Sequence, residues 1–171
     1  MVKVIFIDDN YLYKNFPLPK RMDRASLLSI IQLEQFTSMQ DLLGTCLYTD
    51  LEDKVYNQTL NADEEELFKL VKYSLSMYSA KAAISILRTE TSRTKAEEKN
   101  QDQYVLDTIL STIESKVEYV NKRVVEFIKS KTAIYDIATA DGCDNDLFDE
   151  QDTYNSSIYY PKNPINDCES R

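Results

Sequence analysis

The sequence predicts an all-α protein: a helical bundle of about four helices, one of them long, with an extended N-terminal arm and an extended acidic C-terminal tail. Three observations predict this class. The 171 residues include only two glycines and four prolines, apolar residues recur at helical spacings of three and four over most of the chain, and the charge changes sharply near residue 141. We therefore divide the chain into an arm over residues 1–22, a helical domain over residues 23–140 and a tail over residues 141–171.

The predicted arm starts with a short β-branched and aromatic run, Val4 to Ile7, and ends with two prolines. Proline fixes φ and biases the residue before it toward extended geometry, so residues 15–20 are expected to be extended rather than helical. One strand alone is not stable. We expect the run to pair with Ile158-Tyr159-Tyr160 near the other end of the chain, or to add to a sheet edge on another subunit.

The helical domain starts with a helix that Asp23 is placed to cap and that continues to Leu43. Gly44 follows directly. Because glycine accepts the backbone that ends a helix without a Cβ penalty, we interpret Gly44 as a structural joint. A second, short helix with Leu47 and Leu51 on its apolar face is expected after it, and the two helices form a compact hairpin.

The third helix is the clearest core element of the sequence. Asn61-Ala62-Asp63-Glu64 has the pattern of a capping box, and apolar residues from Leu67 to Ile86 follow at steps of three and four. Small residues beside this stripe let a neighbouring backbone come close: Ser76, Ser79, Ala80 and Ala83. Residues 89–102 are polar and charged throughout and are expected to form a solvated loop or a frayed helix end.

The fourth predicted helix runs from Gln103 to about Ala138 and carries a heptad seam. The apolar residues that repeat every seven positions are Leu106, Ile113, Val120, Phe127 and Ile134. Such a helix is roughly 50 Å long, so part of it is expected to pack on something other than its own chain. The alternative is a break near residues 129–132, which gives two ordinary helices in one bundle.

The composition excludes several kinds of active site. The chain has no histidine, which rules out Ser-His and Cys-His nucleophilic chemistry. Its only glycines, at positions 44 and 142, cannot form a glycine-rich phosphate loop. Three widely spaced cysteines argue against a disulfide framework and against a zinc site. We therefore expect no enzyme activity, no cofactor and no bound metal.

The net charge of −9 is concentrated in the tail, where residues 141–171 carry 2 basic and 8 acidic groups. The rest of the chain is near neutral, which supports neither a nucleic-acid stripe nor a basic membrane face. No apolar run approaches the roughly 18 residues of a membrane span, and the acidic start is too short for a signal peptide. The tail lacks the spacing of a calcium loop and is interpreted as an acidic linker to an aromatic docking segment.

Aromatic and β-branched residues in the arm and in the tail are the candidates for contacts between subunits. Tyrosine combines a large rigid area with a hydroxyl, which suits interfaces. The alternative is that these side chains cover the helices of their own chain. The candidate interface residues are Phe6, Ile7, Tyr11, Tyr154, Ile158, Tyr159 and Tyr160.

Several of these features, in this order, resemble the head-tail connector proteins of tailed bacteriophages, in particular the small neck or ring proteins of crAss-like and related Bacteroides phages. The resemblance covers residues 1–88 well, and the rest of the chain is similar only in the order of its parts. It is carried by Phe16-Pro17-Leu18-Pro19, the capping Asp23, the Ile31-Gln32-Leu33-Glu34-Gln35 helix, the Leu42-Leu43-Gly44-Thr45 joint and the alanine-rich third helix.

The resemblance implies a structural virion protein that assembles side by side into a closed ring between portal and tail. Its partners would be other copies of itself, the portal protein and neighbouring connector or tail proteins, reached by the terminal arms. The genome would pass through the lumen without sequence-specific contacts. The protein would be made in the cytoplasm of the host bacterium and reside in the neck of the particle.

Two other functions stay open. A cytosolic helical adaptor would be a stable monomer or dimer with both arms protected from protease. A carboxylate-dependent magnesium hydrolase would need no histidine, because Mg²⁺ takes oxygen ligands. Its candidate ligands, which also have plainer roles as helix caps and ion-pair partners, are Asp50, Asp53, the Glu64–Glu66 cluster, Glu114 and Glu118.

Overall fold

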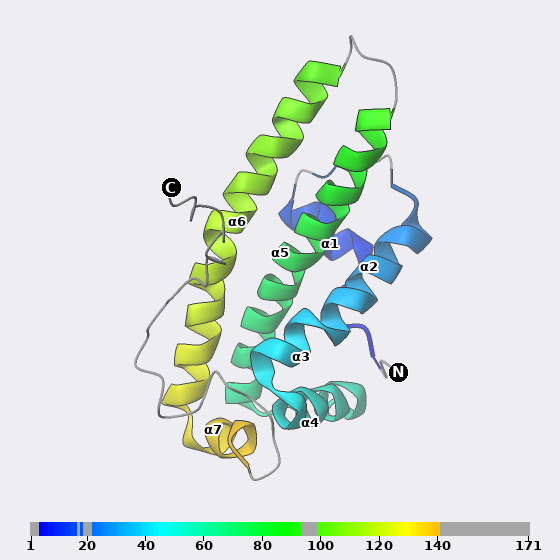
Figure 1. Ribbon diagram of the computed structural model, residues 1–171. Coiled ribbons are helices and arrows are strands. Elements are labelled where there is room, and N and C mark those ends of the chain that lie inside the picture. Colours follow the sequence, from blue (N-terminus) through cyan, green and yellow to red (C-terminus); the bar gives the residue numbers. More distant parts are fainter. Residues whose placement is uncertain (1–3, 17, 19–21, 94–98, 141–171) are drawn as a thin grey trace, which may run out of the picture.

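The computed structural model describes residues 4–16, 18, 22–93 and 99–140. All regular elements in these ranges are α-helices, which confirms the predicted all-α class. Two long helices dominate: α5 (Ala62–Arg93) and α6 (Lys99–Ser130) lie side by side and run antiparallel (Figure 1). The shorter helices gather around the lower part of this pair, so its upper end projects beyond them.

The N-terminal residues differ from the predicted extended arm. Helix α1 (Asp9–Asn15) begins after Asp8, whose carboxylate accepts a hydrogen bond from the Tyr11 N–H at 2.8 Å. Residues 4–7 precede it without forming a strand. Leu12 is fully buried in the core. A helix of seven residues is not stable in isolation, so burial of its inner face on the chain's own helices decides its conformation, and the prediction of an extended arm is wrong for these seven residues.

The helix expected between Asp23 and Leu43 is divided into two. Asp23 does cap α2 (Arg24–Phe36), accepting a hydrogen bond from the Ser26 N–H at 3.0 Å. The helix ends at Thr37, and α3 (Ser38–Leu43) begins directly after it. Gly44 then lies between α3 and α4 (Thr45–Asn57) with φ of 75° and ψ of 157°. This backbone region is essentially restricted to glycine.

Helix α5 is the centre of the fold, because it contacts α1, α2, α3 and α6. Its capping box is present: the Glu64 N–H donates to Asn61 Oδ1 and the Asn61 N–H donates to Glu64 Oε2, both at 2.9 Å. The apolar stripe that we predicted on this helix does not stay buried to its C-terminal member, because Ile86 is 42% exposed. The small residues that we expected to allow close helix packing are buried: Ser76, Ser79, Ala80 and Ala83.

The heptad seam of α6 faces α5 of the same chain, and the expectation that part of it packs elsewhere is wrong for its buried members. Leu106, Ile113, Val120 and Val124 are buried on α6, Phe127 is half-buried, and Ile134 is buried on α7. The break that we considered near residues 129–132 occurs at Lys131, and α7 (Thr132–Ala138) turns away from the axis of α6 to contact α4 (Figure 1). The predicted loop at residues 89–102 is shorter than expected, since α5 continues to Arg93 and α6 begins at Lys99.

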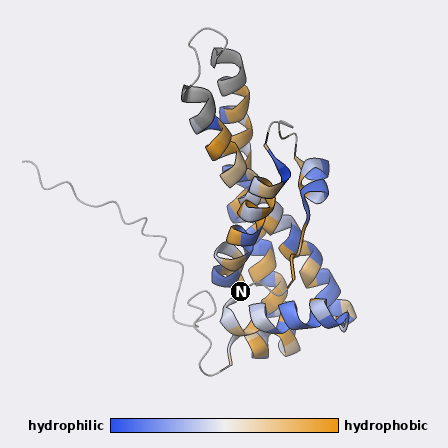
Figure 2. Ribbon diagram, turned by 90° about the vertical axis from the view of Figure 1, so that its right-hand side faces the viewer, coloured by the Kyte–Doolittle hydropathy of each residue, from blue (hydrophilic) through white to orange (hydrophobic). Residues whose placement is uncertain are grey.

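Hydrophobic residues lie mainly along the sides on which the helices meet, and hydrophilic residues mainly on the outer sides (Figure 2). The buried residues of all seven described helices, together with those of the N-terminal segment, form one continuous core. One core of this kind gives the described residues a single folded unit from residue 4 to residue 140.

Candidate functional site

The residues that we predicted at subunit contacts fall into two groups. Phe6 and Ile7 are core residues of their own chain, 5% and 4% exposed. Tyr11 is half-buried and packs against the same core. The predicted contacts in the tail, Tyr154 and Ile158-Tyr159-Tyr160, lie outside the described residues.

The N-terminal segment, defined here as residues 4–18, is attached to the helices through the side chain of Gln35. The Phe6 N–H donates to Gln35 Oε1 at 2.8 Å, and Gln35 Nε2 donates to the Val4 carbonyl at 2.8 Å. Gln35 is fully buried on α2. Gln35 was not predicted from the sequence, although a signal exists: it lies at a step of four from the buried Ile31 and Met39, where an apolar residue is expected.

The Phe6 ring packs against one aromatic ring of α4 and one of α5. Its centroid lies 5.2 Å from that of Phe68 in an edge-to-face arrangement and 5.9 Å from that of Tyr48. The Tyr48 hydroxyl accepts a hydrogen bond from Gln35 Nε2 at 3.3 Å and points toward the buried Glu52. Burial raises the pKa of Tyr48 despite the Gln35 hydrogen bond. Gln35, Tyr48 and Phe68 together hold both the backbone and the ring of the N-terminal segment.

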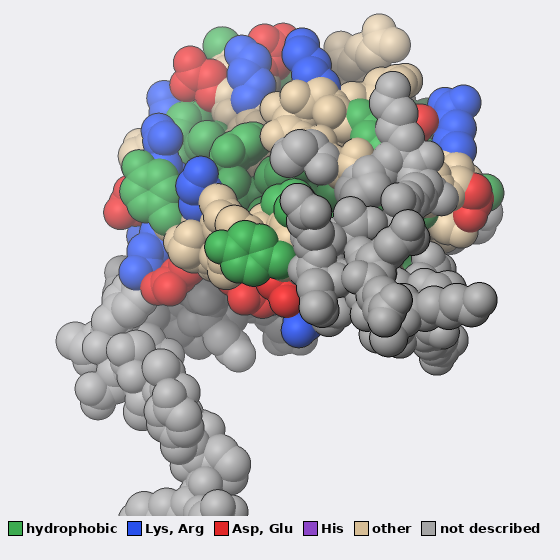
Figure 3. Space-filling view, turned by 90° about the horizontal axis from the view of Figure 1, so that it is seen from above, with side chains coloured by type: hydrophobic (Ala, Val, Ile, Leu, Met, Phe, Trp, Pro, Cys, Tyr) green, Lys and Arg blue, Asp and Glu red, His purple; other side chains and the backbone are tan. Residues whose placement is uncertain are grey.

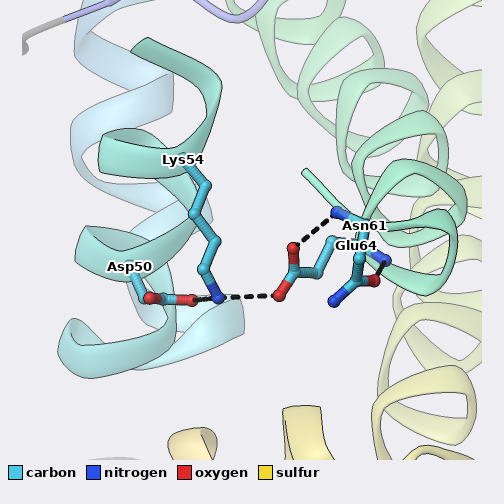
Figure 4. A network of polar contacts seen from close by, with 4 residues as sticks. All are labelled: Asp50, Lys54, Asn61 and Glu64. Atoms are coloured by element: carbon cyan, nitrogen blue, oxygen red, sulfur yellow. Dashed lines mark hydrogen bonds and ion pairs between the residues drawn. The ribbon is translucent and has the colours of Figure 1, made fainter. Parts of the chain in front are cut away.

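A second polar cluster joins α4 to the first turn of α5 (Figure 4). Lys54 Nζ lies 2.7 Å from both Asp50 Oδ2 and Glu64 Oε1. The hydrogen bonds that Lys54 donates, first to Asp50 and then to Glu64, raise its pKa. Burial opposes ionisation of Glu64, but the bonds from Lys54 and from the Asn61 N–H outweigh it and lower the pKa of Glu64. The cluster is an ion-paired helix cap that fixes α4 against α5.

The carboxylates proposed as magnesium ligands are dispersed among ion pairs. Asp50 and Glu64 share Lys54, Glu114 pairs with Lys81 at 3.2 Å, and Glu118 pairs with Lys122 at 2.9 Å. Within residues 4–16, 18, 22–93 and 99–140, no group of three or more acidic, cysteine or histidine side chains is arranged to hold a metal ion.

Cys46 departs from the cysteine prediction. It is disulfide-bonded in the first turn of α4, whereas the spacing of the cysteines argued against a disulfide framework. The other two cysteines of the chain lie outside the described residues. Wide spacing in the sequence therefore did not exclude a bonded cysteine, because distance along the chain does not fix distance in the fold.

Large apolar side chains are exposed on several helices, among them α2 and α6, which both contact α5. On α2, Leu33 and Phe36 are 60% and 50% exposed. On α6, Tyr104 and Tyr119 are 72% and 62% exposed, and Val105 is half-exposed. We call these the α2 surface and the α6 surface. Seen from above, hydrophobic side chains are exposed among interspersed acidic and basic ones, without a field of one sign (Figure 3).

A hollow of about 470 Å³ lies between the start of α2 and the upper part of α5. Its lining mixes apolar and polar side chains: Met22, Asp23, Ala25, Ser26, Ser29, Ile30 and Ile86. The Asp23 carboxylate is already engaged by the Ser26 N–H and hydroxyl as the cap of α2. Those hydrogen bonds, first from the Ser26 side chain, lower the pKa of Asp23.

No protein-family model, curated protein or solved structure matches this chain. Among the described residues, none of the helices has the length and apolar character needed to cross a bilayer.

Proposed function

We propose that this protein is a non-enzymatic structural virion protein that forms a closed ring in the head-tail connector of a tailed phage, between portal and tail. The observation that carries the proposal is the presence of exposed large apolar side chains on both the α2 surface and the α6 surface. A head-to-tail contact uses two different surfaces of the same chain, and it closes into a ring when the rotation between copies allows.

Each surface exposes side chains of the kind that form subunit contacts. Leu33 and Phe36 are three residues apart and therefore lie on one side of α2. Tyr104 and Tyr119 provide large, rigid side chains whose hydroxyls suit a partly hydrated interface. Side-by-side packing of the α2 surface of one copy against the α6 surface of the next would cover both.

The near-neutral described body and the acidic tail suit the wall of a channel through which DNA moves. Lys and Arg side chains of the body are largely interspersed with acidic ones, so no continuous basic stripe would retain phosphates. The helical bundle with its acidic tail then has two tasks: the body forms the ring, and residues 141–171 dock on a neighbouring subunit or on the portal. Deletion of residues 141–171 should leave the helical content nearly intact and abolish incorporation into particles.

Variants with one blocked surface test the ring directly. Leu33→Asp with Phe36→Asp blocks the α2 surface, and Tyr104→Asp with Tyr119→Asp blocks the α6 surface. Each variant alone should fail to form rings in the presence of purified portal. A mixture should give one-to-one dimers, because each variant retains the surface that the other lacks.

Tyr56→Asp is the matched control, since Tyr56 is 65% exposed and belongs to α4 rather than to α2 or α6. Mass photometry and negative-stain images report the species formed. The proposal fails if the wild-type protein stays monomeric at all concentrations with portal present, or if the blocked variants form the same species as Tyr56→Asp.

A further inference from the structure

The C-terminal half of α6 is basic, in contrast to the chain as a whole. Residues 116–131 include five basic side chains but only two acidic ones, Glu118 and Glu126. Glu118 is already paired with Lys122 at 2.9 Å. Among the residues that the structure describes, three exposed cations of this stretch form no ion pair: Lys116, Arg123 and Lys129.

These cations surround one exposed aromatic ring. Lys116, Tyr119 and Arg123 are three and four positions apart, so they share one face of the helix, and Tyr119 is 62% exposed. Lys129 lies in the last turn, where a cation favours the negative end of the helix dipole. That effect fades within the last turn, so it gives no reason for the other two cations. We call these four residues the basic surface.

A segment of opposite charge follows the described residues, which end at Ala140. Residues 141–152 carry six acidic and no basic side chains, with Leu147 and Phe148 in their middle. We call them the acidic linker. Its carboxylates complement the cations of the basic surface, and its two apolar side chains suit the ring of Tyr119.

The acidic linker can reach the basic surface of its own chain. Helix α7 contacts α6, begins at Thr132 directly after it and is only about 10 Å long. Lys116 lies about 20 Å along α6 from Ser130. Twelve extended residues span up to about 40 Å, which is enough to extend from Ala140 over the whole basic surface. Attachment to the same chain also gives the linker a high effective concentration at this surface.

We propose that the acidic linker of each chain binds the basic surface of that same chain. Its carboxylates face the three cations, and its apolar side chains cover Tyr119. Because Tyr119 also belongs to the α6 surface, the bound linker and a neighbouring copy compete for it; this consequence rests on the proposed function. Docking of the tail on the portal then frees Tyr119 for the ring contact.

Zero-length cross-linking of the full-length protein tests the contact, because a carbodiimide joins a lysine amine only to a carboxylate in direct contact with it. At physiological salt, we expect Lys116 and Lys129 to cross-link to carboxylates of the acidic linker. An equal mixture of isotope-labelled and unlabelled protein identifies the chain, since contacts within one chain give cross-linked peptides of a single isotope composition.

Two lysines elsewhere serve as internal controls. Lys131 and Asp63 are 2.6 Å apart on helices fixed by the fold, so they should cross-link under all conditions. Lys14 is exposed on α1 and should not join the acidic linker. At 1 M salt, where the Debye length is about 3 Å, the cross-links of the linker should be lost while the one between Lys131 and Asp63 remains.

Arg123→Gln tests the role of charge, because arginine does not react with the reagent. The variant removes one cation and leaves both lysines, so the yield at Lys116 should fall about twofold to fivefold. Arg123→Lys is the matched control and should keep that yield, since it retains the charge.

The contact is overturned if Lys131 and Asp63 cross-link but the acidic linker does not join the basic surface, or if Arg123→Gln leaves the yield unchanged. Cross-links of mixed isotope composition would place the linker on another copy and would also overturn the contact within one chain. The measurement is made on the free protein. Failure of the surface-blocking experiment therefore removes the ring without affecting this contact.

Discussion

Ser74 on α5 and Asn121 on α6 form a polar contact between the two long helices: the Ser74 hydroxyl donates to Asn121 Oδ1 at 2.9 Å. Asn121 Nδ2 in turn donates to the Tyr78 hydroxyl at 2.7 Å. Seven residues further along α5 and seven residues back along α6, Lys81 pairs with Glu114. One more heptad brings Arg88 to Asp107 at 3.1 Å. Polar contacts thus repeat along one edge of the antiparallel seam, which specifies its register.

Asn121→Ala is expected to lower the free energy of unfolding by about 1–3 kcal/mol, because the buried Ser74 hydroxyl loses its acceptor. Ser74→Ala combined with Asn121→Leu should recover most of the loss, since replacing both partners by apolar groups is nearly neutral. Glu114→Ala is the control on the same edge and should cost less than about 1 kcal/mol, because its ion pair is exposed. Urea denaturation measures all three. A double variant no more stable than Asn121→Ala would contradict this account of the contact.

Ser79→Ala should stabilise the protein. The Ser79 hydroxyl is fully buried and has no hydrogen-bond partner among the described residues, so it carries a desolvation cost without compensation. Ser76 is the matched control: it is equally buried on α5, but its hydroxyl donates to the Tyr73 carbonyl at 2.7 Å. Both substitutions change helix propensity by the same amount. Measured by chemical denaturation, the free energy of unfolding of Ser79→Ala should exceed that of Ser76→Ala by about 1 kcal/mol. Equal values would show that the unpaired hydroxyl does not destabilise the protein.

Two described residues have positive φ, and substitutions at them should have opposite effects. Gly44→Ala places a Cβ in a backbone region that only glycine occupies readily, so we expect a loss of about 1–3 kcal/mol. Gln58, at φ of 58° and ψ of 40°, ends α4 in the left-handed region. Gln58→Gly should therefore gain about 1 kcal/mol. Thermal unfolding followed by circular dichroism measures the change in stability of each variant. A loss of stability at both positions would contradict the argument from backbone conformation.

Features with a local cause were predictable from the sequence. Asp23 caps α2 and Asn61 shares a capping box with Glu64, because a cap depends only on residues within one turn. The conformation of α1 was not predictable, since it depends on burial of Leu12 against distant helices. Gln35 was missed for a similar reason. Its place in an amphipathic pattern says that it is buried, but not that its partner is the backbone of Phe6, 29 positions earlier.

The ion pair between Lys54 and Glu64 should make stability depend on pH in the acid range. The folded-state pKa of Glu64 lies below the ordinary value of 4.5, with the Lys54 hydrogen bond outweighing burial. A depressed carboxyl pKa contributes stability that is present above the unfolded pKa and is lost as pH falls through the folded pKa. Lys54, whose pKa is raised above 10.5, stays charged through this range.

Glu64→Gln should therefore cost about 1–3 kcal/mol at pH 7, because the amide keeps an acceptor for the Asn61 N–H but loses the charge that faces Lys54. The difference between wild type and variant should shrink as pH falls below 4.5. Glu65→Gln is the control, one position away in the same turn and exposed, and its effect should be small at every pH. Urea midpoints measured from pH 7 to pH 3 give the comparison. Parallel curves for wild type and Glu64→Gln would mean that this carboxylate does not stabilise the junction of α4 and α5 through its charge.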